Sequence, residues 1–273
     1  MKVINFDTLF ERYLSAWYKR NKDEFKDYEE MENKMPEVYA TFCDAKLPEL
    51  NGKSPREFFA EVTSAEELVN ALQEYIDRGI PVSDVHFDAI VDRKECEQPL
   101  YQLLCSSRSE EVVMMAANLL NELQSSLPLE KYVDDLISGK MGANYLELAT
   151  EILGNYSDLV KEKILSVYDK TNGDVQAAFL NILVNSKGDD RIFTRILSAF
   201  QAADDVALTA AYFGKYGDER ALPFLREKIE SEEINYVEFT ELKNAIEELG
   251  GTVLIEKDFS HDEDYLAMQH VMQ

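Results

Sequence analysis

The 273-residue sequence predicts an all-α fold built from stacked pairs of helices. Apolar, helix-like stretches begin at Val112, Ala143, Asp174, Asp205 and Tyr236, each 31 residues after the one before. Residues that typically start or end helices recur between these stretches. A fixed spacing of this size is typical of stacked supersecondary units, because a lone helix pair cannot bury both of its faces.

The first part of the chain predicts less regular helices. Apolar residues recur at helical spacing over residues 6–17, and a charged stretch over 19–35 is expected to continue that helix. Ser54 and Pro55 mark another helix start, since serine caps a first turn and proline loses no hydrogen bond there.

Three more helices complete this region. Ser64 and Glu67 have the spacing of a capping box, and Gly79 is suited to end that helix in a left-handed conformation. Ser83 is expected to cap the next helix, and residues 98–105 to form one more buried helix. We interpret residues 1–106 as an irregular N-terminal helical domain.

From about residue 107 each unit has an apolar helix, a short polar turn and a second apolar helix. Two turns match closely, Gly188-Asp189-Asp190-Arg191 and Gly217-Asp218-Glu219-Arg220. In both, glycine is suited to end the first helix and aspartate to cap the second. The first helices are expected over 113–123, 145–153, 175–184, 206–216 and 237–249, and the second over 129–137, 159–168, 192–200 and 221–229.

The segment Tyr216-Gly217-Asp218-Glu219-Arg220-Ala221-Leu222-Pro223-Phe224-Leu225 resembles the inter-helix segment of a HEAT-like repeat, and residues 174–197 resemble a second copy. In two weaker copies, Leu127-Pro128 and Tyr156-Ser157-Asp158 replace the Gly-Asp turn. The resemblance covers about residues 107–250 and implies a right-handed α-α superhelix of about four and a half repeats. Such folds usually act as scaffolds or binding surfaces, and a minority are enzymes or nucleic-acid binders.

The tail, residues 251–273, differs from the repeats. Thr252 to Ile255 is a β-branched run that is either a strand or packed coil, and an acidic stretch over 256–264 precedes a short final helix. We expect the tail to cover the open end of the repeat array; the alternative is a mobile peptide that binds a partner.

The net charge of −25 excludes some partners. A strongly negative protein repels nucleic acid and anionic membranes, and it favours basic partners. Neither a signal peptide nor the run of about 20 apolar residues needed for a membrane span is present, so we expect a cytoplasmic protein.

No motif indicates a catalytic centre, a cofactor or a metal site. None of the three histidines lies in a His-Glu-x-x-His motif, and none of the three cysteines in a Cys-x-x-Cys motif. One alternative is that His261, Asp262, Asp264 and His270 gather round a metal if the tail folds back; a solvated charged tail is the simpler interpretation.

Charge separates the two sets of repeat helices. With their flanking turn residues included, the first helices hold 3 basic and 11 acidic residues, net −8, over 110–124, 143–155, 174–187, 205–216 and 236–249. The second helices hold 9 basic and 11 acidic residues, net −2, over 129–139, 158–170, 189–200 and 219–230. In HEAT-like solenoids the second helices line the concave face, so the resemblance implies a less acidic groove there. Its candidate partner-binding residues are the cations that recur along the second helices: Lys131, Lys161, Arg191, Arg195, Arg220 and Arg226.

We therefore expect a non-enzymatic interaction or scaffold module whose groove takes a protein or peptide of acidic or polar character. A structural role for the cations is the alternative: HEAT-like repeats often pair an aspartate near the turn with a basic residue on the second helix, and Asp189 with Arg195 has that spacing. A second alternative for function is an enzyme with its site between the N-terminal domain and the groove.

Overall fold

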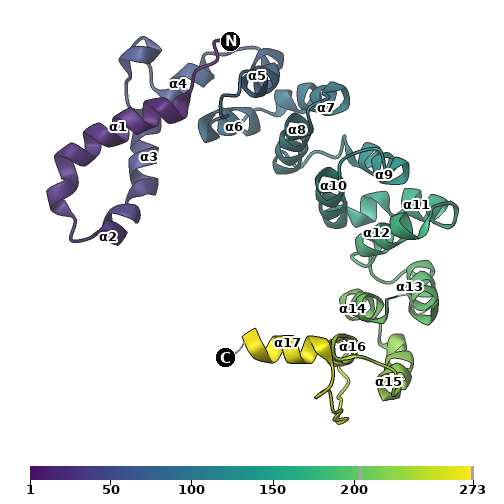
Figure 1. Ribbon diagram of the computed structural model, residues 1–273. Coiled ribbons are helices and arrows are strands. Elements are labelled where there is room, and N and C mark those ends of the chain that lie inside the picture. Colours follow the sequence, from purple (N-terminus) through teal and green to yellow (C-terminus); the bar gives the residue numbers. More distant parts are fainter. Residues whose placement is uncertain (203–204, 272–273) are drawn as a thin grey trace. The chain divides into compact units, whose positions relative to one another are not determined.

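The computed structural model describes residues 1–202 and 205–271, with side chains up to residue 268. Every regular element in these ranges is a helix, and a single β-bridge joins Leu47 to Lys53. The all-α prediction is confirmed. The chain forms two compact units, residues 1–128 and the residues from 129 onward (Figure 1). None of the described helices has the length and apolarity needed to cross a membrane.

Unit 1 packs its helices around a core that includes the buried rings of Phe6, Phe42, Phe59 and Tyr75. Helix α1 packs against α3, α5 against α7, and α7 against α8. The helices are α1 (Phe6–Asn21), α2 (Tyr28–Glu32), α3 (Met35–Asp44), α4 (Pro55–Ala60), α5 (Ala65–Asp77), α6 (Asp84–Val91), α7 (Glu97–Ser106) and α8 (Glu110–Glu122).

The expected continuous helix over 19–35 is wrong, because local capping starts a new helix. The Asp27 carboxylate accepts a hydrogen bond from the Glu30 amide at 2.9 Å, and the Lys26 amide donates to the Glu30 carboxylate at 2.9 Å. The first of these bonds caps α2, which begins at Tyr28 as a separate helix after α1 has ended at Asn21.

The predicted caps are confirmed in part. Ser54 and Glu57 form a complete capping box, whereas the Ser64 hydroxyl accepts from the Glu67 amide without the reciprocal bond. Ser83 stands at the expected start of α6, but its hydroxyl is buried with no hydrogen-bond partner among the described residues. Serine spacing therefore located these helix starts without fixing the capping bond.

Unit 2 arranges the repeat helices in two layers (Figure 1). The first helices of the repeats form one layer, in which α10 packs against α12 and α14 against α16. The second helices form the other layer. The first-layer helices are α10 (Ala143–Asn155), α12 (Gly173–Leu183), α14 (Val206–Tyr216) and α16 (Tyr236–Glu248), and the others are α9 (Leu129–Ser138), α11 (Ser157–Val167), α13 (Asp190–Ala202) and α15 (Leu222–Glu230).

The expected repeat helices are all present, and contacts place α8, the first helix of the first repeat, in unit 1. The division of the chain at residues 106 and 250 stays a prediction. The turn at Gly217 is confirmed, since this glycine ends α14 with a φ of 76°. Gly188 also has a positive φ, of 81°, but it does not end a helix, because α12 already ends at Leu183. Asp189 and Asp218 each accept a hydrogen bond from the amide two residues on.

The tail lies against α16. Residues 252–258 have no regular secondary structure, and α17 (Glu263–Val271) follows. The Phe259 ring packs on Tyr236 and Phe239, and the Asp262 carboxylate accepts a hydrogen bond from the Tyr236 amide at 3.0 Å. These contacts support a covering role, with the 252–255 run as coil rather than strand.

Candidate functional site

Two of the cations nominated by the sequence tie neighbouring repeats together. Arg191 donates to Asp189 in its own turn and forms two hydrogen bonds, of 2.9 and 2.6 Å, with Glu162 of α11. Arg220 in the same way joins Asp218 to Asp190 at the start of α13. The Arg191 guanidinium beside Asp189 lowers the pKa of that carboxyl to about 2. Both arginines therefore act as inter-repeat clamps.

The expected pairing of Asp189 with Arg195 is wrong. Arg195 instead binds Asp169 at 3.0 Å, and its guanidinium lies over the Tyr168 ring, 5.1 Å from the centroid. Asp189 is already occupied by Arg191, which is closer in the chain and shares its turn. Arg195 therefore pairs with a carboxylate of the preceding repeat, but this carboxylate is Asp169 and not Asp189.

The other three nominated cations differ in their surroundings. The Lys131 Nζ lies 2.8 Å from a carboxylate oxygen of Asp135, and the Lys161 Nζ lies 3.6 Å from a carboxylate oxygen of Asp158. Arg226 is exposed on α15, and no ion pair of it is seen within the described residues. The structure thus shows a pairing role for most of these cations, and their role in a binding groove stays a prediction.

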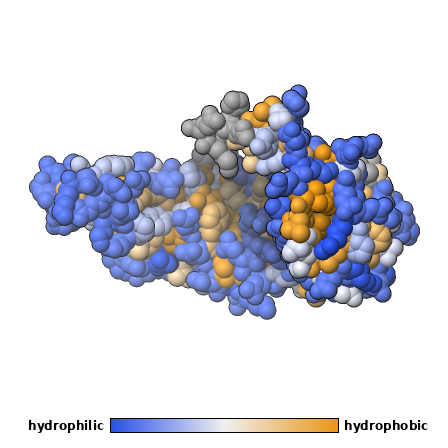
Figure 2. Space-filling model, turned by 90° about the horizontal axis from the view of Figure 1, so that it is seen from below, coloured by the Kyte–Doolittle hydropathy of each residue, from blue (hydrophilic) through white to orange (hydrophobic). Residues whose placement is uncertain are grey.

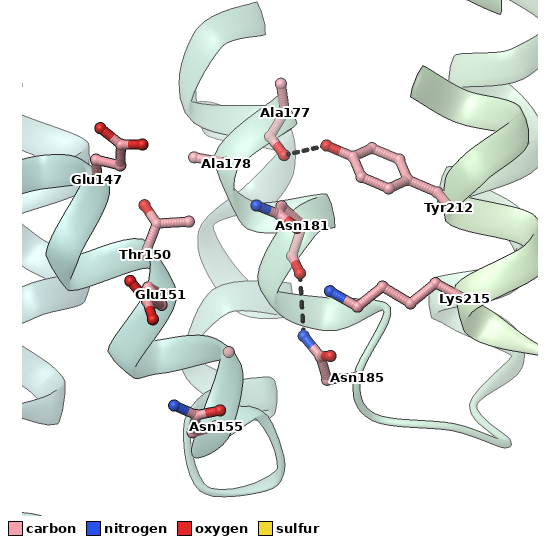
Figure 3. Close-up of a pocket in the computed structure, with 11 residues that line it drawn as sticks. Glu147, Thr150, Glu151, Asn155, Ala177, Ala178, Asn181, Asn185, Tyr212 and Lys215 are labelled. Atoms are coloured by element: carbon pink, nitrogen blue, oxygen red, sulfur yellow. Dashed lines mark hydrogen bonds between the residues drawn. The ribbon is translucent and has the colours of Figure 1, made fainter. Parts of the chain in front are cut away.

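A polar hollow in unit 2 lies among the first helices of the repeats. A cavity of about 590 Å³ opens between α10, α12 and α14 (Figure 3). Its lining is mostly polar: Glu147, Thr150, Glu151, Asn155, Asn181, Asn185, Tyr212 and Lys215, with Gly154, Ala177 and Ala178.

Hydrogen bonds set the shape of this cavity. The buried Tyr212 hydroxyl donates to the Ala177 carbonyl at 3.3 Å and so links α14 to α12. The Asn185 amide donates to the Asn181 and Ile182 carbonyls at 3.1 and 3.0 Å, which satisfies the end of α12. Figure 3 shows the Lys215 side chain extending from α14 toward these asparagines.

The acidic and basic residues of the cavity lie on opposite walls. Glu147 and Glu151 come from α10, one helical turn apart, and the Lys215 ammonium comes from α14 on the opposite side (Figure 3). The side chain of Asn181 lies between them and offers both a donor and an acceptor. The cavity can therefore accept a polar ligand that carries hydrogen-bonding groups along its length.

A second cavity, of about 420 Å³, adjoins this one. Arg195 and Asp169 line it, and the Tyr212 ring lines both cavities. The second cavity lies between the two layers, since residues of α13 as well as α12 and α14 line it. Among the nominated cations, Arg195 is the one that lines either of these two cavities.

The first cavity went unrecognised in the sequence, although a signal was present. Thr150, Asn181 and Tyr212 stand 31 residues apart and occupy the same position in three consecutive first helices. The difference in charge between the two sets of helices does not reveal them, because these three residues carry no charge. A search for uncharged polar residues at one repeat position would have found them.

The structure gives no support to the alternative of a metal site in the tail. No group of three or more His, Cys, Asp or Glu side chains in the described part of the chain is placed to hold a metal ion. The side chain of His270 lies outside that part.

Comparison with known proteins gives no further guide: no family model, no curated protein and no solved structure matches this chain. The HEAT-like resemblance therefore rests on the residues quoted above and stays a prediction.

Proposed function

We propose that unit 2 is a non-enzymatic binding module, and that the cavity on α10, α12 and α14 takes an extended segment of a partner protein. The observation that carries this is the row Thr150, Asn181 and Tyr212, at one position of three successive repeats. A repeat array places equivalent side chains at regular intervals, and an extended peptide has its N–H and C=O groups at regular intervals as well. The side chains of the row can therefore form hydrogen bonds along such a peptide.

The chemistry of the lining supports a peptide rather than an apolar ligand. An asparagine amide can donate to a peptide carbonyl and accept from a peptide N–H. Lys215 at one wall and the two glutamates at the other would select a segment of mixed charge. This proposal keeps the partner class expected from the sequence but moves the site from the second helices to the first.

The right-handed HEAT-like superhelix is part of the same proposal. It is supported by the 31-residue spacing and by the inter-repeat bonds of Arg191 and Arg220. No described contact favours the enzyme alternative, and the residues that line the cavity include no histidine or cysteine.

A pair of matched charge reversals tests the site. A peptide selected from a displayed random library against the full chain serves as the probe, and its affinity is measured by fluorescence anisotropy. Lys215→Glu should weaken binding about tenfold, about 1.4 kcal/mol, and Asn181→Ala by a few-fold. Arg226→Glu, on an exposed second-helix cation, should leave the affinity within about twofold.

The reverse pattern would place the groove on the second helices, as the sequence first indicated. Equal affinities for all variants would contradict both sites. Circular dichroism of each variant confirms that the helices remain folded.

A further inference from the structure

The tail contains a strand-like segment without a sheet. Over residues 252–258 the side chains alternate, with Val253, Ile255 and Lys257 partly covered and the residues between them exposed. An alternation of period two is the pattern of a β-strand that rests one face on a protein surface.

The backbone of this segment is free to pair. No N–H or C=O of residues 252–258 has a hydrogen-bond partner within the described part of the chain. The segment is nevertheless held at both ends: the Gly251 amide donates to the Ile246 carbonyl at 2.8 Å, and Phe259 packs on Tyr236. The Lys257 ammonium also contacts the Ser231 carbonyl. An anchored strand with open edges loses less conformational freedom on binding than a mobile one.

An apolar residue marks the exposed face. Leu254 is 92 % exposed, whereas each core leucine is at most 8 % exposed. Figure 2 views the protein from the side on which this segment lies, and apolar side chains gather there among hydrophilic ones. Leu254 therefore offers a partner an apolar contact on the exposed face of the segment.

The surroundings of the segment are acidic. A cavity of about 520 Å³ lies beside it, and five carboxylates line that cavity: Glu230, Glu232, Glu256, Asp258 and Asp262. The lysine of the lining, Lys257, is engaged with the Ser231 carbonyl. A ligand at this place therefore meets a surplus of negative charge next to an apolar side chain.

We propose that residues 252–258 dock an extended basic segment of a partner protein by β-strand pairing. The partner's backbone pairs with the open edge, an apolar side chain covers Leu254, and lysine or arginine side chains reach the carboxylates of the cavity. A second copy of this chain is a poorer occupant, because two chains of net charge −25 repel one another. The surface uses none of the residues of the α10–α12–α14 cavity.

The probe is a fluorescein-labelled octapeptide of four Val-Lys pairs, titrated into the full chain and followed by anisotropy. Leu254→Asp should weaken binding about tenfold, although it adds a negative charge that would strengthen non-specific attraction. Leu159→Asp is the matched control, on a leucine of α11 that is 68 % exposed, and should leave the affinity unchanged. N-methylation of alternate peptide amides, which keeps the charge but blocks strand pairing, should also cost about tenfold.

Hydrogen exchange of the amides over 252–258 supplies a second readout. They should exchange rapidly in the free protein and become protected with the peptide. Equal affinity for the N-methylated peptide, or for Leu254→Asp, would overturn the proposal by showing attraction through charge alone. A dimer in light scattering with these amides already protected would overturn it in favour of a second copy.

Discussion

The buried histidine of unit 1 predicts a loss of stability in mild acid. The His86 side chain is 0 % exposed and stacks on the Phe59 ring with centroids 4.7 Å apart. Its Nε2 lies 2.8 Å from the Leu68 carbonyl and donates to it, while Nδ1 is buried without a partner among the described residues. Burial disfavours the charged ring and lowers the pKa of His86 from 6.5 to about 4.

The sign and size follow from proton linkage. Between these two pKa values the unfolded chain binds a proton that the folded chain does not, so the stabilising contribution is complete above pH 6.5 and is lost as the pH falls toward 4. The free energy of unfolding should drop by about 2 kcal/mol between pH 7.5 and pH 5, with a limiting slope of about 1.4 kcal/mol per pH unit.

The assay is urea unfolding followed by the fluorescence of Trp17, the single tryptophan, which lies on α1 of the same unit. His86→Gln removes the titrating ring and keeps a side-chain donor. It should lower stability at pH 7.5 and flatten the pH dependence between pH 7.5 and 5. An unchanged slope in this variant would refute the reasoning, because the proton uptake would then belong to other groups.

Three further predictions concern unit 2. Tyr216→Phe should cost about 1–2 kcal/mol in thermal unfolding, since the Tyr216 hydroxyl donates to the Asp189 carbonyl and accepts from its amide, both at 2.8 Å; an unchanged melting temperature would contradict this. Gly214→Val should cost about 1–3 kcal/mol, because a Cβ at Gly214 would lie 3.3 Å from the Ala245 Cα of α16; a stability equal to wild type would show that the two helices separate easily. Arg220→Ala should lower the melting temperature in low salt and have little effect in 1 M NaCl, because its ion pairs are exposed; a salt-independent loss would point to its packing on a ring instead.

Much of the fold followed from local signals. Gly217 ended α14 as expected, because a left-handed residue is needed there and glycine adopts that conformation without strain. The wrong prediction over residues 19–35 also has a local cause. The Asp27 carboxylate accepts from the Glu30 amide, and the Glu30 carboxylate accepts from the Lys26 amide, so a new helix starts there. The spacing of apolar residues gives no sign of these side-chain bonds to the backbone.

The site was harder to predict because side-chain partners depend on how the repeats stack. Arg191 reaches Glu162, 29 residues earlier, and Arg195 reaches Asp169, so cations that formed a free ladder in the sequence are largely paired in the structure. The sequence shows that these residues are charged, but it does not show whether they are free to bind a partner.

The sequence alone determined most of the helices and the repeat period, because caps, glycines and apolar spacing act over a few residues. Only the tertiary structure decided where the polar cavity of unit 2 lies. Thr150, Asn181 and Tyr212 share one repeat position, but they line a cavity because α10, α12 and α14 leave space between them that no side chain fills. Such a gap depends on the volumes of residues far apart in the chain, which a period does not encode.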